Sequence, residues 1–308
     1  MAGTSHRILV LLALLLAVAG GCKPKGESVP QVHKFPGMNI PSAITDPQAR
    51  LSYAAVHYWD AYFREGAVAD TSETEGAMAT YLTLLDKVPV AEAQKGVAAF
   101  FGKVDAVEPD ETRTRLVELV CRYLYDPNSP YRDEDLYLPF AKGMAESPRT
   151  PDNVRASFAF DAQRCSLNVF GQKAADFTYR TADGRSHRMY DIKTKYTMMV
   201  FTNPGCSACK EIAASMEKYT YIPDMLEKGR LTILNVFVDE DLDSWRANLG
   251  KYPDKWINGY DPHLAIREGG IYSLRAIPSI YLLDEDKRVI YKDVPVEKAV
   301  QGLLTERK

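Results

Sequence analysis

The spacing of apolar residues changes near Gly171, and this change constrains the fold more than any other feature. Between residues 44 and 168, apolar residues recur at intervals of three and four, as on amphipathic helices. From about residue 169, short apolar runs rich in β-branched and aromatic residues alternate with amphipathic stretches. We therefore predict an all-α domain over 44–168 and an α/β domain over 169–308. A length of 308 residues is typical of two domains.

The first half is predicted to be a series of helices separated by prolines. Asp46 followed by Pro47 is typical of an N-cap with proline at the first helical position. An apolar face then runs from Leu51 to Tyr62, and a last helix is expected over 152–167. Strand patterns do not occur here, and no internal repeat is convincing. We expect a helical bundle or a repeat-like array.

The second half contains four apolar runs that predict strands. They cover residues 196–202, 231–238, 279–283 and 288–292. Amphipathic helices are expected at 206–220, 241–249 and 295–304, and the run 256–261 is expected to be an aromatic-flanked loop. Strands that alternate with helices and end in a hairpin predict a mixed sheet.

The first 22 residues are typical of an export signal. Arg7 precedes an apolar run over 8–19, which is too short to span a bilayer. Small residues then lead to Cys22, an arrangement that resembles a bacterial lipobox, where cleavage leaves a lipidated cysteine. We expect a lipoprotein signal peptide over 1–21, lipidation of Cys22 and a flexible linker over 22–43. Ordinary signal cleavage, with Cys22 uninvolved, is the alternative.

The composition excludes several classes of protein. Hydrophobic residues make up 46% and charged residues 26%, as in soluble globular proteins. The formal net charge is −3, from 38 basic and 41 acidic residues, so no basic excess indicates binding to nucleic acid. The five histidines are scattered, which argues against a metal site.

The motif Cys206-Ser207-Ala208-Cys209 carries the clearest chemical signal. It follows the strand predicted over 196–202 and begins a predicted helix. A thiol in the first helical turn lies near unpaired backbone N–H groups, which lower its pKa. Two intervening residues place the second sulfur within bonding reach of the first. Cys206 is thus a candidate nucleophile and Cys209 a candidate resolving thiol, with Gly205 in the preceding turn.

Three other interpretations of this motif remain open. Zinc binding would need about four ligands, and no second pair of cysteines or histidines supplies them. A structural disulfide would use the same two cysteines. A peroxidatic cysteine would resemble a site with Thr three residues before Cys206, where Asn203 stands.

A proline loop follows later in the chain, directly before the strand predicted over 279–283. Ile277 and Pro278 lie in this loop, and X–Pro bonds adopt the cis form far more readily than other peptide bonds. The loop resembles the cis-proline loop of the thioredoxin superfamily, which implies a cis bond that exposes the Ile277 backbone to a bound chain. A trans proline at an edge strand is the alternative.

Residues 171–308 resemble the thioredoxin-like thiol-disulfide oxidoreductases of the bacterial cell envelope. The resemblance rests on the segment Gly171 to Phe177, Asp183-Gly184, the apolar strand, the CxxC motif and the proline loop, in that order. His57-Tyr58-Trp59-Asp60 resembles the helical domain of unknown function that precedes this fold in a type of bacterial lipoprotein. The resemblance implies an α/β thioredoxin fold after an all-α domain. It also implies that Ile277, Pro278 and Gly205 shape a substrate groove.

This sequence departs from the thioredoxin pattern at three points. Thioredoxins usually have Trp before the first cysteine and Pro between the two, where Gly205 and Ala208 stand here. The strand over 196–202 also lacks their buried carboxylate, a proton relay for the resolving cysteine. These departures affect rate and redox potential and leave disulfide exchange feasible.

The resemblance implies a thiol-disulfide oxidoreductase of the cell envelope. The expected partners are protein thiols or disulfides and an envelope redox partner, with the membrane reached through lipidated Cys22. No metal or organic cofactor is implied. The competing hypothesis is a client-binding or structural lipoprotein that keeps the thioredoxin fold as a scaffold. Cys121 is expected to be a buried core thiol, and a Cys121–Cys165 disulfide stays open.

Overall fold

The structure, a computed structural model, describes residues 33–305 and 307. The predicted signal peptide over 1–21, Cys22 and the linker residues 23–32 lie outside the described residues. Residues 33–43 form neither helix nor strand. Two regions follow, which we call the helical region (residues 33–168) and the sheet region (residues 169–305 and 307).

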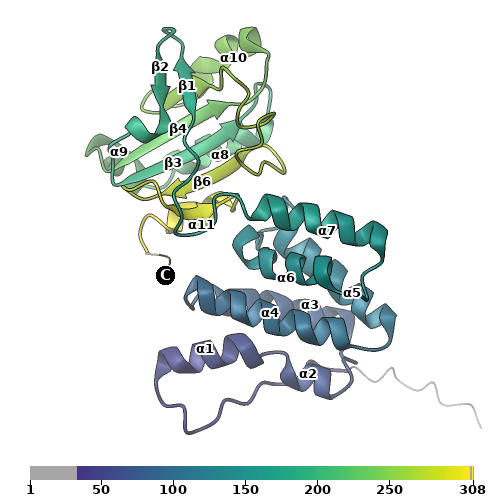
Figure 1. The fold of residues 1–308 in the computed structure, drawn as a ribbon. Helices are drawn as coiled ribbons and strands as arrows, with labels where there is room; N and C mark the ends of the chain where they lie inside the picture. Colours follow the sequence, from purple (N-terminus) through teal and green to yellow (C-terminus); the bar gives the residue numbers. More distant parts are fainter. Residues whose placement is uncertain (1–32, 306, 308) are drawn as a thin grey trace, which may run out of the picture. The chain divides into compact units, whose positions relative to one another are not determined.

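The helical region consists of helices stacked side by side (Figure 1). Helix α1 packs against α4, α4 against α6, and α6 against α7. This arrangement fits the expected helical array. The helices are α1 (Pro47–His57), α2 (Asp60–Arg64), α3 (Thr71–Leu85), α4 (Val90–Ala106), α5 (Asp110–Val120), the π-helical turn η1 (Cys121–Tyr125), α6 (Glu134–Glu146) and α7 (Asp152–Cys165).

The start of α1 is confirmed, but its expected length is wrong. The Asp46 side chain accepts a hydrogen bond from the Ala49 N–H at 2.6 Å, and Pro47 is the first helical residue. The helix ends at His57, and a turn separates it from α2, where an uninterrupted face up to Tyr62 was expected. Trp59 in this turn is 1% exposed and packs against Phe100. No glycine or proline marks the break, so aromatic packing in the core decides it.

Helix α6 contains a proline that its surroundings compensate. Pro139 has no N–H group and therefore cannot donate to the carbonyl oxygen of Asp135. The Gln94 side chain of α4 donates to that oxygen instead, at 2.9 Å. This bond satisfies the buried acceptor and ties α6 to α4.

The sheet region is built on a seven-stranded mixed sheet in the order β2-β1-β5-β4-β3-β6-β7. Strand β3 is central, with all seven residues buried, and pairs in parallel with β4 and antiparallel with β6. The four predicted strands are β3, β4, β6 and β7, correct to within one residue at each end. The strands are β1 (Thr178–Thr181), β2 (Ser186–Arg188), β3 (Tyr196–Thr202), β4 (Leu231–Phe237), β5 (Ile257–Tyr260), β6 (Ser279–Leu283) and β7 (Val289–Lys292).

The expected loop at 256–261 is instead strand β5, which pairs with β4 and β1. Asn258-Gly259 reads locally as a turn, which explains the error. In the sheet, a Cβ on Gly259 would lie 2.7 Å from the ring of Tyr179, so the close packing there accepts only glycine. Tertiary packing thus decides this strand.

Helices and loops cover the two faces of the sheet with two separate apolar cores. On one face, Met198 and Val200 of β3 pack with α8, α9 and α11. On the other, Met199 and Phe201 pack with residues that include Tyr272 of the loop before β6. The helices here are the 3-10 turn η2 (Met189–Asp191), α8 (Ser207–Glu217), α9 (Tyr221–Glu227), α10 (Leu242–Asn248), the 3-10 turn η3 (Leu249–Lys251) and α11 (Val296–Gln301).

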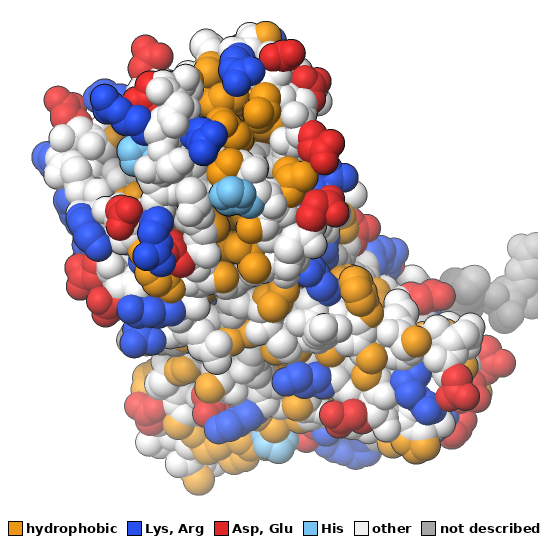
Figure 2. All heavy atoms as spheres, turned by 45° about the horizontal axis from the view of Figure 1, so that its top comes forward, with side chains coloured by type: hydrophobic (Ala, Val, Ile, Leu, Met, Phe, Trp, Pro, Cys, Tyr) orange, Lys and Arg blue, Asp and Glu red, His pale blue; other side chains and the backbone are white. Residues whose placement is uncertain are grey.

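The surface and the helix lengths carry two further observations. On the face drawn in Figure 2, apolar side chains form a band with both basic and acidic side chains at its edges. That mixture of signs agrees with the small net charge. Within the described part of the chain, no helix combines the length and apolar character needed to cross a membrane.

Candidate active site

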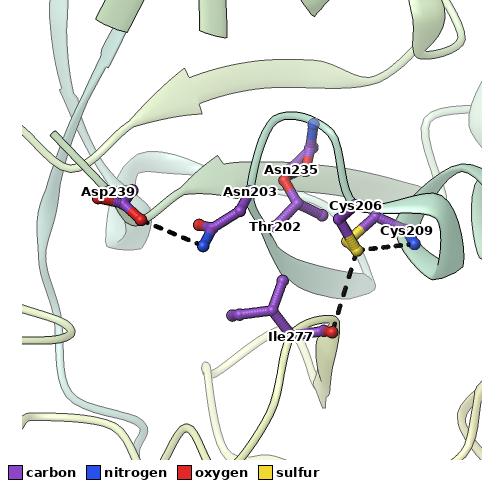
Figure 3. Close-up of a disulfide and its surroundings, with 7 residues drawn as sticks. All are labelled: Thr202, Asn203, Cys206, Cys209, Asn235, Asp239 and Ile277. Atoms are coloured by element: carbon purple, nitrogen blue, oxygen red, sulfur yellow. Dashed lines mark hydrogen bonds between the residues drawn. A yellow bond between two sulfur atoms is a disulfide. The ribbon is translucent and has the colours of Figure 1, made fainter. Parts of the chain in front are cut away.

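The Cys206–Cys209 pair lies where the central strand passes into a helix (Figure 3). Strand β3 ends at Thr202, residues 203–205 form a turn, and Cys206 is the N-cap of α8. Gly205 has a φ of +79°, in the left-handed region that glycine enters without strain. The turn therefore places Cys206 among the free N–H groups of the helix start.

The two cysteines form a disulfide, and they differ in exposure. Their sulfur atoms are 2.16 Å apart. Cys206 is half-buried, whereas Cys209 is only 1% exposed. The Cys209 N–H donates to the Cys206 sulfur at 3.1 Å. In the reduced protein, such a bond favours the thiolate of Cys206, the sulfur that is also easier to reach.

The loop before β6 faces this disulfide. The carbonyl oxygen of Ile277 lies 3.9 Å from the Cys206 sulfur, although the two residues are 71 positions apart in sequence. The peptide bond between Ile277 and Pro278 is cis. The fold therefore brings both cysteines together with the predicted proline loop. Cys22 lies outside the described residues.

A buried polar chain in the surroundings of the disulfide was missed by the sequence analysis. The Thr202 hydroxyl donates to the side-chain oxygen of Asn235 at 2.6 Å. The Asn235 amide in turn donates to Asn258 of β5 at 2.9 Å. A signal was available, because Thr202 and Asn235 are polar residues within mostly apolar strands. The chain links three strands near the carboxyl ends of β3 and β4.

The turn before Cys206 is held by the loop after β4. The Asn203 amide donates to Asp239 at 3.3 Å, and Asp239 pairs with Arg267 at 3.2 Å. The Asn203 carbonyl oxygen also accepts from the Cys206 N–H at 3.4 Å. These contacts fix the turn. Strand β3 itself contains no acidic residue, as its sequence indicated.

The remaining described cysteines lie in the helical region and are not paired. Cys121 and Cys165 are both free thiols, so the disulfide considered between them is not formed. Cys121 is half-buried, less than expected, beside the hydroxyl of Tyr137 at 3.7 Å, and burial raises its pKa to about 11. Cys165 is fully buried, and burial together with the nearby Glu134 charge raises its pKa. Both thiols are poor nucleophiles.

Metal-ligating side chains do not gather elsewhere in the structure. In residues 33–305 and 307, no three His, Cys, Asp or Glu side chains are grouped so as to hold a metal ion.

The fold and this site define a thioredoxin-like protein, and solved structures agree. A thioredoxin-like protein from Bacteroides caccae is 31% identical with a TM-score of 0.76, and the match covers 89% of this chain and 99% of that chain. The chain belongs to this family of thioredoxin-like proteins. The predicted thioredoxin fold after a helical region is thus confirmed.

Two other structures match less than half of this chain. The C-terminal domain of an uncharacterized protein from Bacteroides fragilis is 36% identical, with a TM-score of 0.44, over 45% of this chain and 99% of that chain. The thioredoxin domain of a thiol-disulfide oxidoreductase from Bacteroides vulgatus is 21% identical, with a TM-score of 0.40, over 44% and 96%.

The helical region has its own family match. The family described as a domain of unknown function, DUF5106, matches residues 21–161. No curated protein matches this chain.

Proposed function

We propose that this protein is a thiol-disulfide oxidoreductase that exchanges disulfides with protein clients. The observation that carries the proposal is the disulfide at the start of α8. Its Cys206 sulfur lies 3.9 Å from the Ile277 carbonyl oxygen. A scaffold would need neither thiol nor this juxtaposition.

The exchange needs only the two cysteines and the client. The Cys206 thiolate attacks a client disulfide, forms a mixed disulfide and releases one client thiolate. Cys209 then loses its proton to water and attacks the Cys206 sulfur. The second client thiol leaves as the Cys206–Cys209 disulfide forms. The client gains two electrons and the protein loses two, and the reverse sequence oxidises a client.

The proline loop and the Gly205 turn form the walls of the client groove in this proposal. The exposed backbone of Ile277 pairs with an extended client segment as an added strand does, and Pro278 and Gly205 leave room beside Cys206. Backbone hydrogen bonds do not involve the side chains of the client, so the groove accepts many client sequences.

The proposed location is the bacterial cell envelope. Removal of residues 1–21 would leave Cys22 as a lipidated N-terminus that anchors the protein in the membrane, with the linker over 22–43 as a tether. The proposed partners are client proteins with thiols or disulfides and an envelope redox protein that resets the dithiol. No nucleic acid or organic cofactor enters this proposal. Metabolic labelling with a fatty acid tests the anchor, because Cys22→Ala should abolish incorporation.

The reduction potential of the Cys206–Cys209 pair is the decisive measurement. The purified protein is equilibrated against glutathione mixtures, and its free thiols are counted by alkylation and mass spectrometry. A value near about −270 mV indicates a reductase supplied with electrons, and one near about −120 mV indicates a donor of disulfides. A pair that shows no reversible titration would refute the proposal and favour a non-catalytic scaffold. The Cys206→Ser/Cys209→Ser variant supplies the baseline.

A further inference from the structure

The loop that ends at Pro278 is held by the helical region at several points. Arg164 of α7 donates to the Gly270 carbonyl oxygen at 3.2 Å. Asn168, just after α7, donates to the Ile271 carbonyl oxygen at 2.8 Å. These bonds fix the backbone at the start of the loop. The sheet region alone therefore does not supply all the contacts that shape it.

Glu134, the first residue of α6, makes the contacts nearest to the proline. Its Oε1 atom accepts from the Ser273 hydroxyl at 3.0 Å and pairs with Arg275 Nε at 3.0 Å. Glu134 is 0% exposed, so its carboxylate has exchanged water for these partners. Ser273 and Arg275 lie four and two residues before Ile277. Glu134, a side chain of the helical region, thus contacts two residues of the loop that ends at Pro278.

The other end of the loop is tied to the same group of charges. Arg275 also donates to Asp293 Oδ2 at 2.9 and 2.6 Å from its Nε and second terminal nitrogen. Asp293 Oδ1 accepts from the Ser279 hydroxyl at 2.8 Å. The residues on either side of Ile277–Pro278 therefore share one carboxylate. A shift of Arg275 would move both flanks of the cis peptide bond.

These residues belong to a buried charge cluster that joins the two regions. It contains four carboxylates and four cations, with every side chain at most 17% exposed. Removal of charges from water costs free energy that such pairs rarely recover in full, so stability alone is a weak reason for the cluster. Its members are Asp133, Glu134, Asp135, Arg275, Lys292, Asp293, Lys298 and Arg307.

The pKa of Glu134 is compatible with a role in holding the loop. Burial and the Asp293 charge raise its pKa to about 7, against the opposing effects of Lys292 and Arg275. In either protonation state the carboxyl group retains an acceptor oxygen for Ser273 and Arg275. The loop contacts therefore do not depend on full ionisation.

We propose that Glu134 is a positioning residue for the client-binding loop. It holds Ser273 and Arg275 so that the Ile277 backbone stays opposite Cys206. The helical region then completes the substrate groove of the sheet region. This inference rests on the proposed function for its kinetic readout. Misplacement of a binding group by about 1 Å can cost about 100-fold in rate, so a loosened loop should be measurable.

The test compares two buried acids that are neighbours on α6. Glu134→Ala removes both loop contacts. Asp135→Ala is the matched control, because Asp135 is also 0% exposed and pairs with Lys292 and Arg307 but with no residue of the loop 270–279. Glu134→Gln keeps an acceptor oxygen and should restore the wild-type behaviour. All variants are made in the full-length chain.

The kinetic readout separates the groove from the sulfur chemistry. Reduced protein is mixed with a disulfide-bonded peptide or with 2-hydroxyethyl disulfide, which is too small to pair with a strand. For Glu134→Ala, we expect a fall of about 10- to 100-fold in the rate with the peptide and a change of under about 2-fold with the small disulfide. Asp135→Ala should reduce both rates equally or neither. Equal effects of Glu134→Ala and Asp135→Ala on the ratio of the two rates would overturn the proposal.

A structural readout decides the matter independently of activity. Hydrogen exchange of the amides in residues 270–279 should be at least about 10-fold faster in Glu134→Ala than in Asp135→Ala. In Glu134→Gln the exchange rate should equal that of the wild type. Equal exchange in all variants would refute the positioning role. If Glu134→Ala does not fold, Ser273→Ala, which removes one contact, should show the same changes at smaller size. Absence of wild-type exchange with both disulfides would refute the proposed function, and amide exchange would still test Glu134.

Discussion

The helical region and the sheet region each contain two cysteines. The two pairs lie in different surroundings and differ in bonding. Cys165 lies in the helical core, and the half-buried Cys121 packs against that core. Cys206 and Cys209 lie at a strand-to-helix turn, bonded to each other. The same side chain is thus a packing element in one region and half of a disulfide in the other.

Backbone geometry explains this difference. Burial outweighs the hydrogen bond from the Tyr137 hydroxyl and raises the pKa of Cys121 to about 11. The start of α8 offers free N–H groups, one of which points at the Cys206 sulfur. We therefore expect the reactivity of each cysteine to follow its position in its element.

The largest effect expected from this comparison is the loss of exchange in Cys206→Ser. Without its nucleophile, the protein should exchange disulfides with a peptide at least on the order of 10³-fold more slowly. Stopped-flow fluorescence of a labelled peptide measures this rate. Cys121→Ser is the matched control from the helical region and should leave the rate unchanged. Equal losses of rate in both variants would refute the different roles assigned to the cysteines of the two regions.

A second, smaller effect is expected in the alkylation of the reduced protein. At pH 7, iodoacetamide should modify Cys206 at least about 100-fold faster than Cys121, because only thiolates react and a pKa of about 11 leaves few of them. Peptide mapping by mass spectrometry against time gives both rates in one sample. Comparable rates at the two sites would contradict the assigned environments.

The smallest effect concerns an ion pair inside the helical region and sharpens the contrast with Glu134. Burial opposes ionisation of Asp105, but hydrogen bonds from Ser147 and Arg113 outweigh it and lower its pKa. A lowered pKa in the folded state stabilises the fold above the unfolded value, and this contribution is lost as the pH falls. Asp105→Asn should cost about 2 kcal/mol at pH 7, and the difference from wild type should shrink below about pH 4.

Urea unfolding at pH 7, 5 and 3.5 checks this dependence. Asp152→Asn is the control, since Asp152 is 94% exposed in its pair with Arg155 and should leave the unfolding midpoint unchanged. A cost for Asp105→Asn that does not vary with pH would refute the role of its charge.

Local signals were enough to predict most elements of the sheet region and the ends of several helices. The buried strands β3 and β6 read as short apolar runs, and Asp46-Pro47 marked the start of α1. Strand β5 was missed because Asn258-Gly259 looks like a turn until Tyr179 is seen to pack against the glycine. The break at Trp59 was missed because it comes from the aromatic core and not from a helix-breaking residue.

The candidate site divides in the same way. Cys206 and Cys209 were evident from their spacing after a strand, whereas Thr202 and Asn235 needed the pairing of strands to become neighbours. Glu134 could not be found at all from the sequence. It lies 139 residues from Ser273, and no local pattern links an acid at a helix start to a loop so far along the chain.

The sequence by itself determined the order of a helical half and an α/β half, the central strand and the dithiol at the start of a helix. These depend on hydrophobic periodicity and on residues that are neighbours in the chain. Only the tertiary structure decided which sulfur is shielded, which loop faces it and which side chains hold that loop. Such contacts join distant segments, and they form because buried charges and polar groups must find partners wherever the fold brings them.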